Sequence, residues 1–167
     1  MFKPVASEYD QRLSGYILES PDKNLLELFS STDTGDYYKR IPSSKYDYRY
    51  NPGKWSIKEI LNHIIDGERI FSFRALWIAR GCEIELPGYD ENLFSRHSDA
   101  DSRPFEKLIE EYSSVRVSTR LLFQSFNEQM LKRTGVFDNK FASVKSLGYL
   151  IIGHELHHIR VINEKYL

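Results

Sequence analysis

Apolar residues recur at helical spacing over most of the chain, and this feature restricts the fold more than any other. The pattern is clearest after Ser56-Ile57-Lys58-Glu59, which has the form of a capping box and marks the start of a helix. The sequence predicts four helices, over residues 21–40, 56–80, 103–132 and 143–165. We expect one short extended piece, between Gly135 and Phe141. The pattern therefore predicts an all-α protein built as an antiparallel four-helix bundle.

The composition narrows the class of protein. A length of 167 residues suits a single domain over residues 1–167. The 23 basic and 24 acidic side chains nearly cancel, which gives no electrostatic reason to expect a nucleic acid or a membrane as partner. The lone cysteine, Cys82, excludes a disulfide framework within the chain and any multi-cysteine metal site. No segment approaches the roughly 18 apolar residues of a membrane-spanning helix, so we expect a cytoplasmic protein.

Three histidines interrupt the apolar helical stripes. His63 lies between Ile60 and Ile64, while His154 and His158 are four residues apart and share one helix face. A buried imidazole needs a polar partner, and one divalent cation would satisfy three that converge in a bundle interior. Three protein ligands would leave room for water or substrate, as in catalytic metal sites. The alternative is that each is a core histidine bonded to a backbone carbonyl.

The same residues allow a second interpretation. The segment His154-Glu155-Leu156-His157-His158 matches H-E-x-x-H, in which Glu155 would be the general base of a zinc protease. No later predicted helix could supply a third ligand, and an upstream ligand such as His63 reverses the usual order, so the pattern disfavours this interpretation. His157 lies about 100° off the stripe and is expected beside the ligands or at the surface. His97 is expected in a solvated polar loop.

Several segments resemble the signatures of one family. Asn51-Pro52-Gly53-Lys54-Trp55 and its continuation through His63 to Arg69 resemble the first signature of the DinB/YfiT-like superfamily. Residues 148–158, which contain His154 and His158, resemble the second. Residues 73–81 and 86–90 between them also fit, so the resemblance covers nearly the whole chain.

The resemblance implies a DinB-type four-helix bundle with up-down-down-up topology. It also implies a divalent metal, with Zn, Ni, Fe and Mn as candidates, held by His63, His154 and His158. Members of this family include S-transferases and an isomerase that use low-molecular-weight thiols, proteins assigned as metal-dependent hydrolases, and damage-induced proteins of unknown activity. Homodimers are frequent in the family, and we expect one here.

Two functions from different classes remain open. In the first, the protein is a metal-dependent enzyme, a hydrolase or a thiol S-transferase, that acts on a small-molecule electrophile, with a thiol as a possible cosubstrate. Candidates for catalytic or orienting roles are Asp66, Glu68, Glu155 and His157, and candidates for substrate binding are Trp55 and Arg74. In the second, it is a non-enzymatic stress or damage-induced protein that acts by metal binding or interaction. A metal position accessible from a pocket would favour the enzyme.

Overall fold

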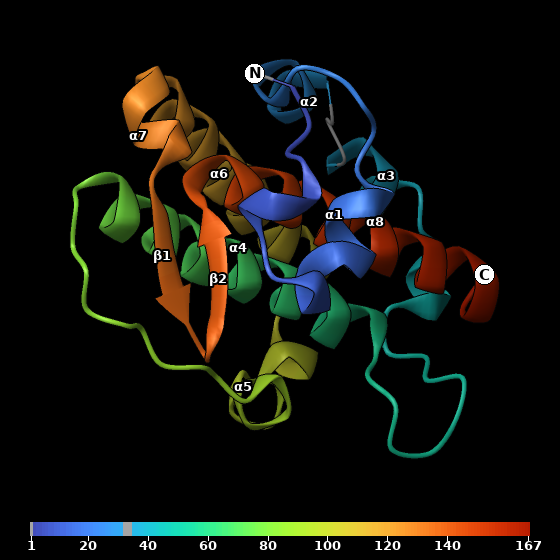
Figure 1. Cartoon of the computed structure of the whole chain (residues 1–167). Helices are drawn as coiled ribbons and strands as arrows, with labels where there is room; N and C mark the ends of the chain where they lie inside the picture. The colour runs from blue at the N-terminus through green and yellow to red at the C-terminus, as the bar shows by residue number, and fades with distance from the viewer. Residues whose placement is uncertain (1, 32–34) are drawn as a thin grey trace.

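A computed structural model of the chain describes residues 2–31 and 35–167. Three long helices form its centre: α4 (Ile57–Ala79), α6 (Phe105–Gln124) and α8 (Val144–Lys165). Helix α4 lies between the other two and packs against both (Figure 1). It begins at the predicted capping box, in which the Ser56 side chain accepts from the Glu59 amide and the Glu59 side chain accepts from the Ser56 amide. Helix α8 begins after Ser143, whose side chain accepts from the Ser146 amide.

The first predicted helix, over residues 21–40, is wrong at its start. The structure has α1 (Ser14–Glu19) before this range, and α2 (Leu25–Ser31) and α3 (Gly35–Lys39) within it. Residues 32–34 of the predicted range lie outside the described residues. Pro21 explains the end of α1, because the residue before a proline is driven out of the helical conformation. Helix α1 packs on α8, whereas α2 and α3 pack on α6.

The prediction of one helix over residues 103–132 is also wrong. Helix α6 ends at Gln124, and a short α7 (Glu128–Lys132) begins after Asn127, whose side chain accepts from the Met130 amide. The side chain that starts the new helix therefore also marks the break. A further short helix, α5 (Glu91–His97), was not predicted and is capped by Asp90. His97 is thus the last residue of a helix rather than part of a loop, although it is exposed as expected.

The predicted extended piece is a β-hairpin. Strands β1 (Thr134–Phe137) and β2 (Lys140–Ser143) pair antiparallel across Asp138 and Asn139, both of which have positive φ. Such a two-residue turn matches the twist of the strands. The hairpin lies across one side of the bundle, beside the segment that joins α4 to α5 (Figure 1). It is the only sheet among the described residues, so the all-α expectation is confirmed. Within the same residues, no helix has the length and apolarity needed to cross a membrane.

Candidate metal centre

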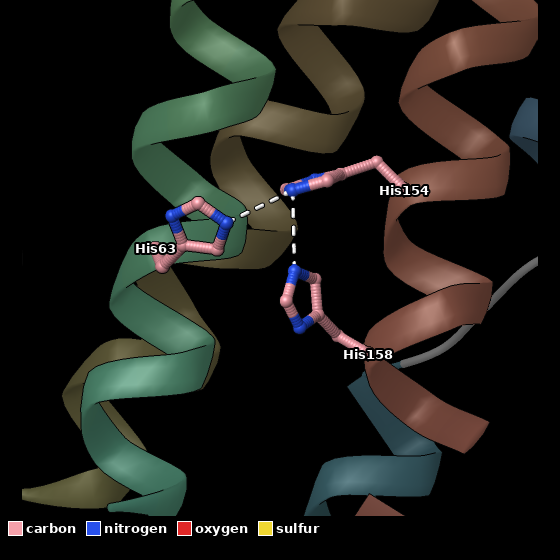
Figure 2. Close-up of side chains that lie close together, drawn as sticks. All are labelled: His63, His154 and His158. Atoms are coloured by element: carbon pink, nitrogen blue, oxygen red, sulfur yellow. Dashed lines mark hydrogen bonds between the residues drawn. The ribbon is translucent and has the colours of Figure 1, made fainter. Parts of the chain in front are cut away.

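The side chains of His63, His154 and His158 converge on one point between α4 and α8. The Nε2 atom of His154 lies 2.9 Å from Nε2 of His63 and 3.2 Å from Nε2 of His158. One ligand atom from each ring lies within 4.8 Å of the others. Figure 2 shows the three rings presenting these nitrogens to a common centre.

The donor set suits a metal better than it suits hydrogen bonding. A neutral imidazole nitrogen is either one donor or one acceptor, so His154 Nε2 cannot form two good hydrogen bonds to its neighbours. Three nitrogens about 2.0–2.1 Å from one tetrahedral ion would lie about 3.3 Å apart, close to the two separations from His154. The alternative of three separate core histidines, each bonded to a carbonyl, does not describe this arrangement.

The electrostatics of the site keep the rings neutral. Burial lowers the pKa of His63 to about 4. Burial, followed by the charges of neighbouring histidines, lowers the pKa of His158 to about 3 and that of His154 well below its ordinary value. A metal ligand must be an unprotonated imidazole, so at neutral pH the cluster needs to release no proton from its rings before it binds an ion.

Two glycines let the helices approach at the cluster. A β-carbon on Gly67 would lie 3.1 Å from Cε1 of His154, which is tighter than ordinary packing. A β-carbon on Gly153 would overlap the carbonyl oxygen of Tyr16 on α1. The backbone of α1 therefore rests directly on α8, one residue before His154. The Tyr16 ring packs edge-on against the His154 ring at 5.2 Å.

The three imidazoles line a cavity of about 380 Å³. Aromatic and charged side chains make up most of the remaining wall. They are Arg12, Tyr16, Trp55, Phe71, Arg74, Tyr89, Glu91, Phe137, Asp138 and Lys140. A pocket of this size, with a few polar groups among aromatic rings, suits a small molecule.

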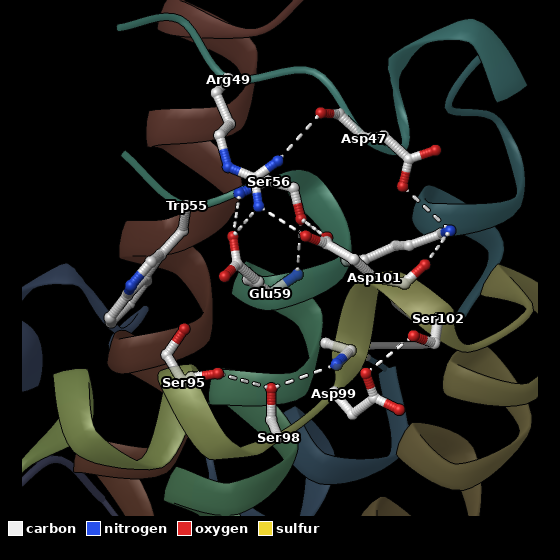
Figure 3. A network of polar contacts seen from close by, with 12 residues as sticks. Asp47, Arg49, Trp55, Ser56, Glu59, Ser95, Ser98, Asp99, Asp101 and Ser102 are labelled. Atoms are coloured by element: carbon white, nitrogen blue, oxygen red, sulfur yellow. Dashed lines mark hydrogen bonds and ion pairs between the residues drawn. The ribbon is translucent and has the colours of Figure 1, made fainter. Parts of the chain in front are cut away.

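Trp55, a candidate for substrate binding, lies in the cavity wall beside a predicted ligand. Its ring is 4.7 Å from the His63 ring, and it also lines a second cavity of about 270 Å³ that His158 shares. A polar network holds the chain next to it (Figure 3). In that network Arg49 donates to both Glu59 and Asp101, and Asp101 also accepts from the Ser56 hydroxyl at 2.6 Å.

Arg74, the other candidate for substrate binding, also lies in the cavity wall. Its side chain is buried, Nη2 donates to the Pro87 carbonyl at 2.9 Å, and its guanidinium carbon lies 4.3 Å from the centre of the Phe137 ring. Burial lowers the pKa of Arg74. The hairpin and the segment before α5 thus both contribute to its surroundings.

The structure does not bring Asp66 or His157 to this cavity. Asp66 accepts from Asn62 at 2.8 Å, and burial raises its pKa. His157 Nδ1 lies 3.2 Å from a carboxylate oxygen of Glu19, and the His157 ring packs edge-on against His158 at 5.2 Å. His157 therefore contacts a predicted ligand and faces the second cavity.

Glu155 and Glu68 lie in a buried ion-pair network rather than on the cavity wall. Arg116 on α6 donates to Glu68 at 2.8 Å and to Glu155 at 2.8 Å, and Tyr38 donates to Glu155 at 3.4 Å. The side chains of Glu68, Arg116 and Glu155 are at least nine-tenths buried. The network joins α4, α6 and α8 next to the histidines. A base role for Glu155 as in H-E-x-x-H has no support in this arrangement.

Sequence reasoning missed Arg116 as the partner of both acids, and it missed the cavity roles of Tyr16 and Tyr89. A β-carbon on Gly67 would lie 3.6 Å from the Tyr89 hydroxyl and 3.1 Å from Cε1 of His154, so both side chains lie against this glycine. Burial, followed by the charge of Glu91, raises the pKa of Tyr89 to about 12. The family resemblance of the segment Leu86-Pro87-Gly88-Tyr89-Asp90 could have pointed to Tyr89 as a residue near the site. No local signal pointed to Tyr16 or Arg116.

Comparison with known proteins agrees with this fold. The sequence profile of the DinB superfamily matches residues 23–162. Among solved structures the chain is similar to YfiT from Bacillus subtilis, described as "a probable metal-dependent hydrolase with an unusual four-helix bundle topology". The two share 19% identity with a TM-score of 0.69, over 98% of this chain and 90% of YfiT. A search of curated proteins found no match. With most of its length matched by the family profile and its DinB-like fold confirmed, the chain belongs to the DinB superfamily.

Proposed function

We propose that the protein is a metal-dependent enzyme that acts on a small molecule, with His63, His154 and His158 as ligands of a divalent ion. The observation that carries this proposal is that all three imidazoles line one cavity. Three protein ligands beside a cavity leave coordination positions for a water or a substrate, whereas a structural site is closed by a fourth protein ligand. The description of YfiT as a probable metal-dependent hydrolase supports the same general chemistry.

A divalent ion held there would act as a Lewis acid and supply a nucleophile at neutral pH, from a water or a thiol. The chain's own residues hold the imidazoles neutral and confine the substrate beside them. The aromatic rings of Trp55 and Phe71 exclude water from part of the wall. Because its pKa is raised to about 12, Tyr89 stays protonated and can donate a hydrogen bond to a polar group of the substrate near His154.

Two reactions suit such a site: hydrolysis of an ester-like substrate, and transfer of a low-molecular-weight thiol to a small electrophile. The test begins with metal analysis of the purified protein and reloading with Zn, Ni, Fe(II) or Mn. Each form is then assayed for hydrolysis of 4-nitrophenyl acetate without thiol, and for conjugation of glutathione or cysteine to 1-chloro-2,4-dinitrobenzene. The His158→Ala variant, treated in the same way, is the control for activity that needs the cluster.

The outcomes separate the alternatives. Turnover that requires a thiol and is lost in His158→Ala assigns the S-transferase, and thiol-independent ester cleavage lost in the same variant assigns the hydrolase. Stoichiometric metal with neither activity would favour the non-enzymatic metal-binding protein. Failure of the protein to bind any of the four metals would contradict the proposal.

A further inference from the structure

Arg74 is a buried cation without an ion-pair partner in the described part of the chain. Only 5% of its surface is exposed, and its one hydrogen bond to the described residues goes to a neutral carbonyl, that of Pro87. Its guanidinium also stacks on Phe137, which supplies no charge. No carboxylate among residues 2–31 and 35–167 comes within ion-pair distance of it. A buried charge is costly unless it is paired, so this position calls for an anion.

The other charged groups of the cavity wall do not meet this need. Arg12 pairs with Asp10, and Lys140 pairs with Asp138. The hydrogen bond from Lys140 lowers the pKa of Asp138, and the charge of Arg74 contributes less. The Asp138 carboxylate forms its ion pair with Lys140. Glu91 is exposed at the first turn of α5. The guanidinium therefore lines the cavity, and no acid among the described residues occupies its donors.

We propose that Arg74 binds the carboxylate of a small organic acid whose other end reaches the three histidines. The planar guanidinium offers paired N–H groups that match a carboxylate. His63 and Arg74 are both on α4, eleven residues apart, which separates their α-carbons by about 16 Å along the axis. Both side chains line the same cavity, so one elongated ligand can contact both. This inference rests on the proposed function for the part of the ligand at the metal.

Matched thiol probes test the two ends separately. Protein loaded with Co(II) is titrated with 3-mercaptopropionate and 3-mercaptopropanol, and with 6-mercaptohexanoate and 6-mercaptohexanol, and binding is followed by the sulfur-to-cobalt absorption band. The alcohols report on the metal alone. At the chain length that spans the cavity, we expect the acid to bind about tenfold or more tightly than the alcohol, because a hydrogen bond to a charged group contributes that much.

The ratio of the acid's affinity to the alcohol's affinity should fall to near one in Arg74→Met. It should rise again in part in Arg74→Lys, which keeps the charge. Arg80→Met, at the exposed C-cap of the same helix, should leave it unchanged. Equal binding of acid and alcohol at both chain lengths, or a preference that survives in Arg74→Met, would overturn the inference. A preference that emerges only in Asp138→Asn would also overturn it, because Asp138 would then be the permanent partner of Arg74.

Failure of the metal proposal would give a different result. If cobalt does not bind, neither the acids nor the alcohols produce the absorption band. The carboxylate site is then tested on the metal-free protein, by following its amide NMR signals during titration with hexanoate and with hexanol. Shifts around Arg74 with hexanoate alone, absent in Arg74→Met, would support the carboxylate site without the metal. Identical responses to the two compounds would contradict it.

Discussion

The Nε2 atoms of His63 and His154 lie 2.9 Å apart, although 91 positions separate the two residues in the chain. Two neutral imidazoles rarely place the same nitrogen face to face unless a shared ion or proton lies between them. His158 adds a third nitrogen at 3.2 Å from the second. Substituting each histidine in turn and measuring metal affinity therefore tests whether that ring is a ligand.

Replacing His158 with Ala should weaken binding of Zn²⁺ by tenfold or more, because one of three imidazole ligands is lost. Competition with a chromophoric chelator measures the affinity. His97→Ala is the matched control, since His97 is exposed and lies outside the cluster, and it should bind as the parent does. Equal affinity in His158→Ala and the parent would remove His158 from the ligand set.

Gly67→Ala should lower metal affinity without removing a ligand. The new β-carbon would lie 3.1 Å from Cε1 of His154, so the ring must move by a few tenths of an ångström away from its position facing His63. We expect a loss of about threefold to tenfold, corresponding to about 1 kcal/mol. Gly15→Ala is the control, because a β-carbon there meets no atom within 4 Å. An unchanged affinity in Gly67→Ala would show that the ring has room to adjust.

Gly153→Ala should destabilise the fold severely. A methyl group there would overlap the Tyr16 carbonyl oxygen, and backbone cannot swing aside as a side chain can. Separating α1 from α8 is expected to cost about 3 kcal/mol or more in the free energy of unfolding. Urea denaturation of Gly153→Ala beside Gly15→Ala measures the difference. Similar midpoints for the two variants would contradict the close contact.

Arg116→Met should destabilise the protein by about 3–5 kcal/mol, because it leaves the carboxylates of Glu68 and Glu155 buried without their shared cation. Arg160→Met removes an exposed partner of Glu19 and should cost far less, because solvent screens an exposed ion pair. Thermal and urea unfolding compare the two. A cost for Arg116→Met no larger than that for Arg160→Met would show that the buried network contributes little.

The homodimer that the family resemblance implies stays a prediction. The net charge of −1 offers little repulsion between copies. Multi-angle light scattering at micromolar concentration should give about twice the mass of one chain. A mass of one chain over the whole concentration range would exclude the dimer.

The helix starts and the histidine cluster could be predicted from the sequence, because they depend on contacts within one turn or on helical spacing. Ser56 and Glu59 cap α4 through contacts within one turn, and Ser143 caps α8 in the same way. The positions of His154 and His158 follow from the helical period, since residues four apart share a face. The break at Asn127 within the predicted helix over residues 103–132 shows the limit of periodicity, because a continued apolar pattern does not reveal where one helix stops and another begins.

Only the tertiary structure decided which partners on distant segments the polar side chains around the site contact. Glu155 follows His154 in the chain, but its carboxylate accepts from Arg116 on α6. The Glu155 side chain therefore does not line the cavity. Tyr16 reaches His154 from a helix that the sequence did not predict, through a contact that depends on the missing side chain of Gly153. Arg74 lines the cavity with the Pro87 carbonyl and the Phe137 ring as neighbours, and with no ion-pair partner in the part of the chain that the structure describes. Periodicity determines which face of a helix a residue occupies, whereas its partners depend on the packing of distant segments, which no local pattern encodes.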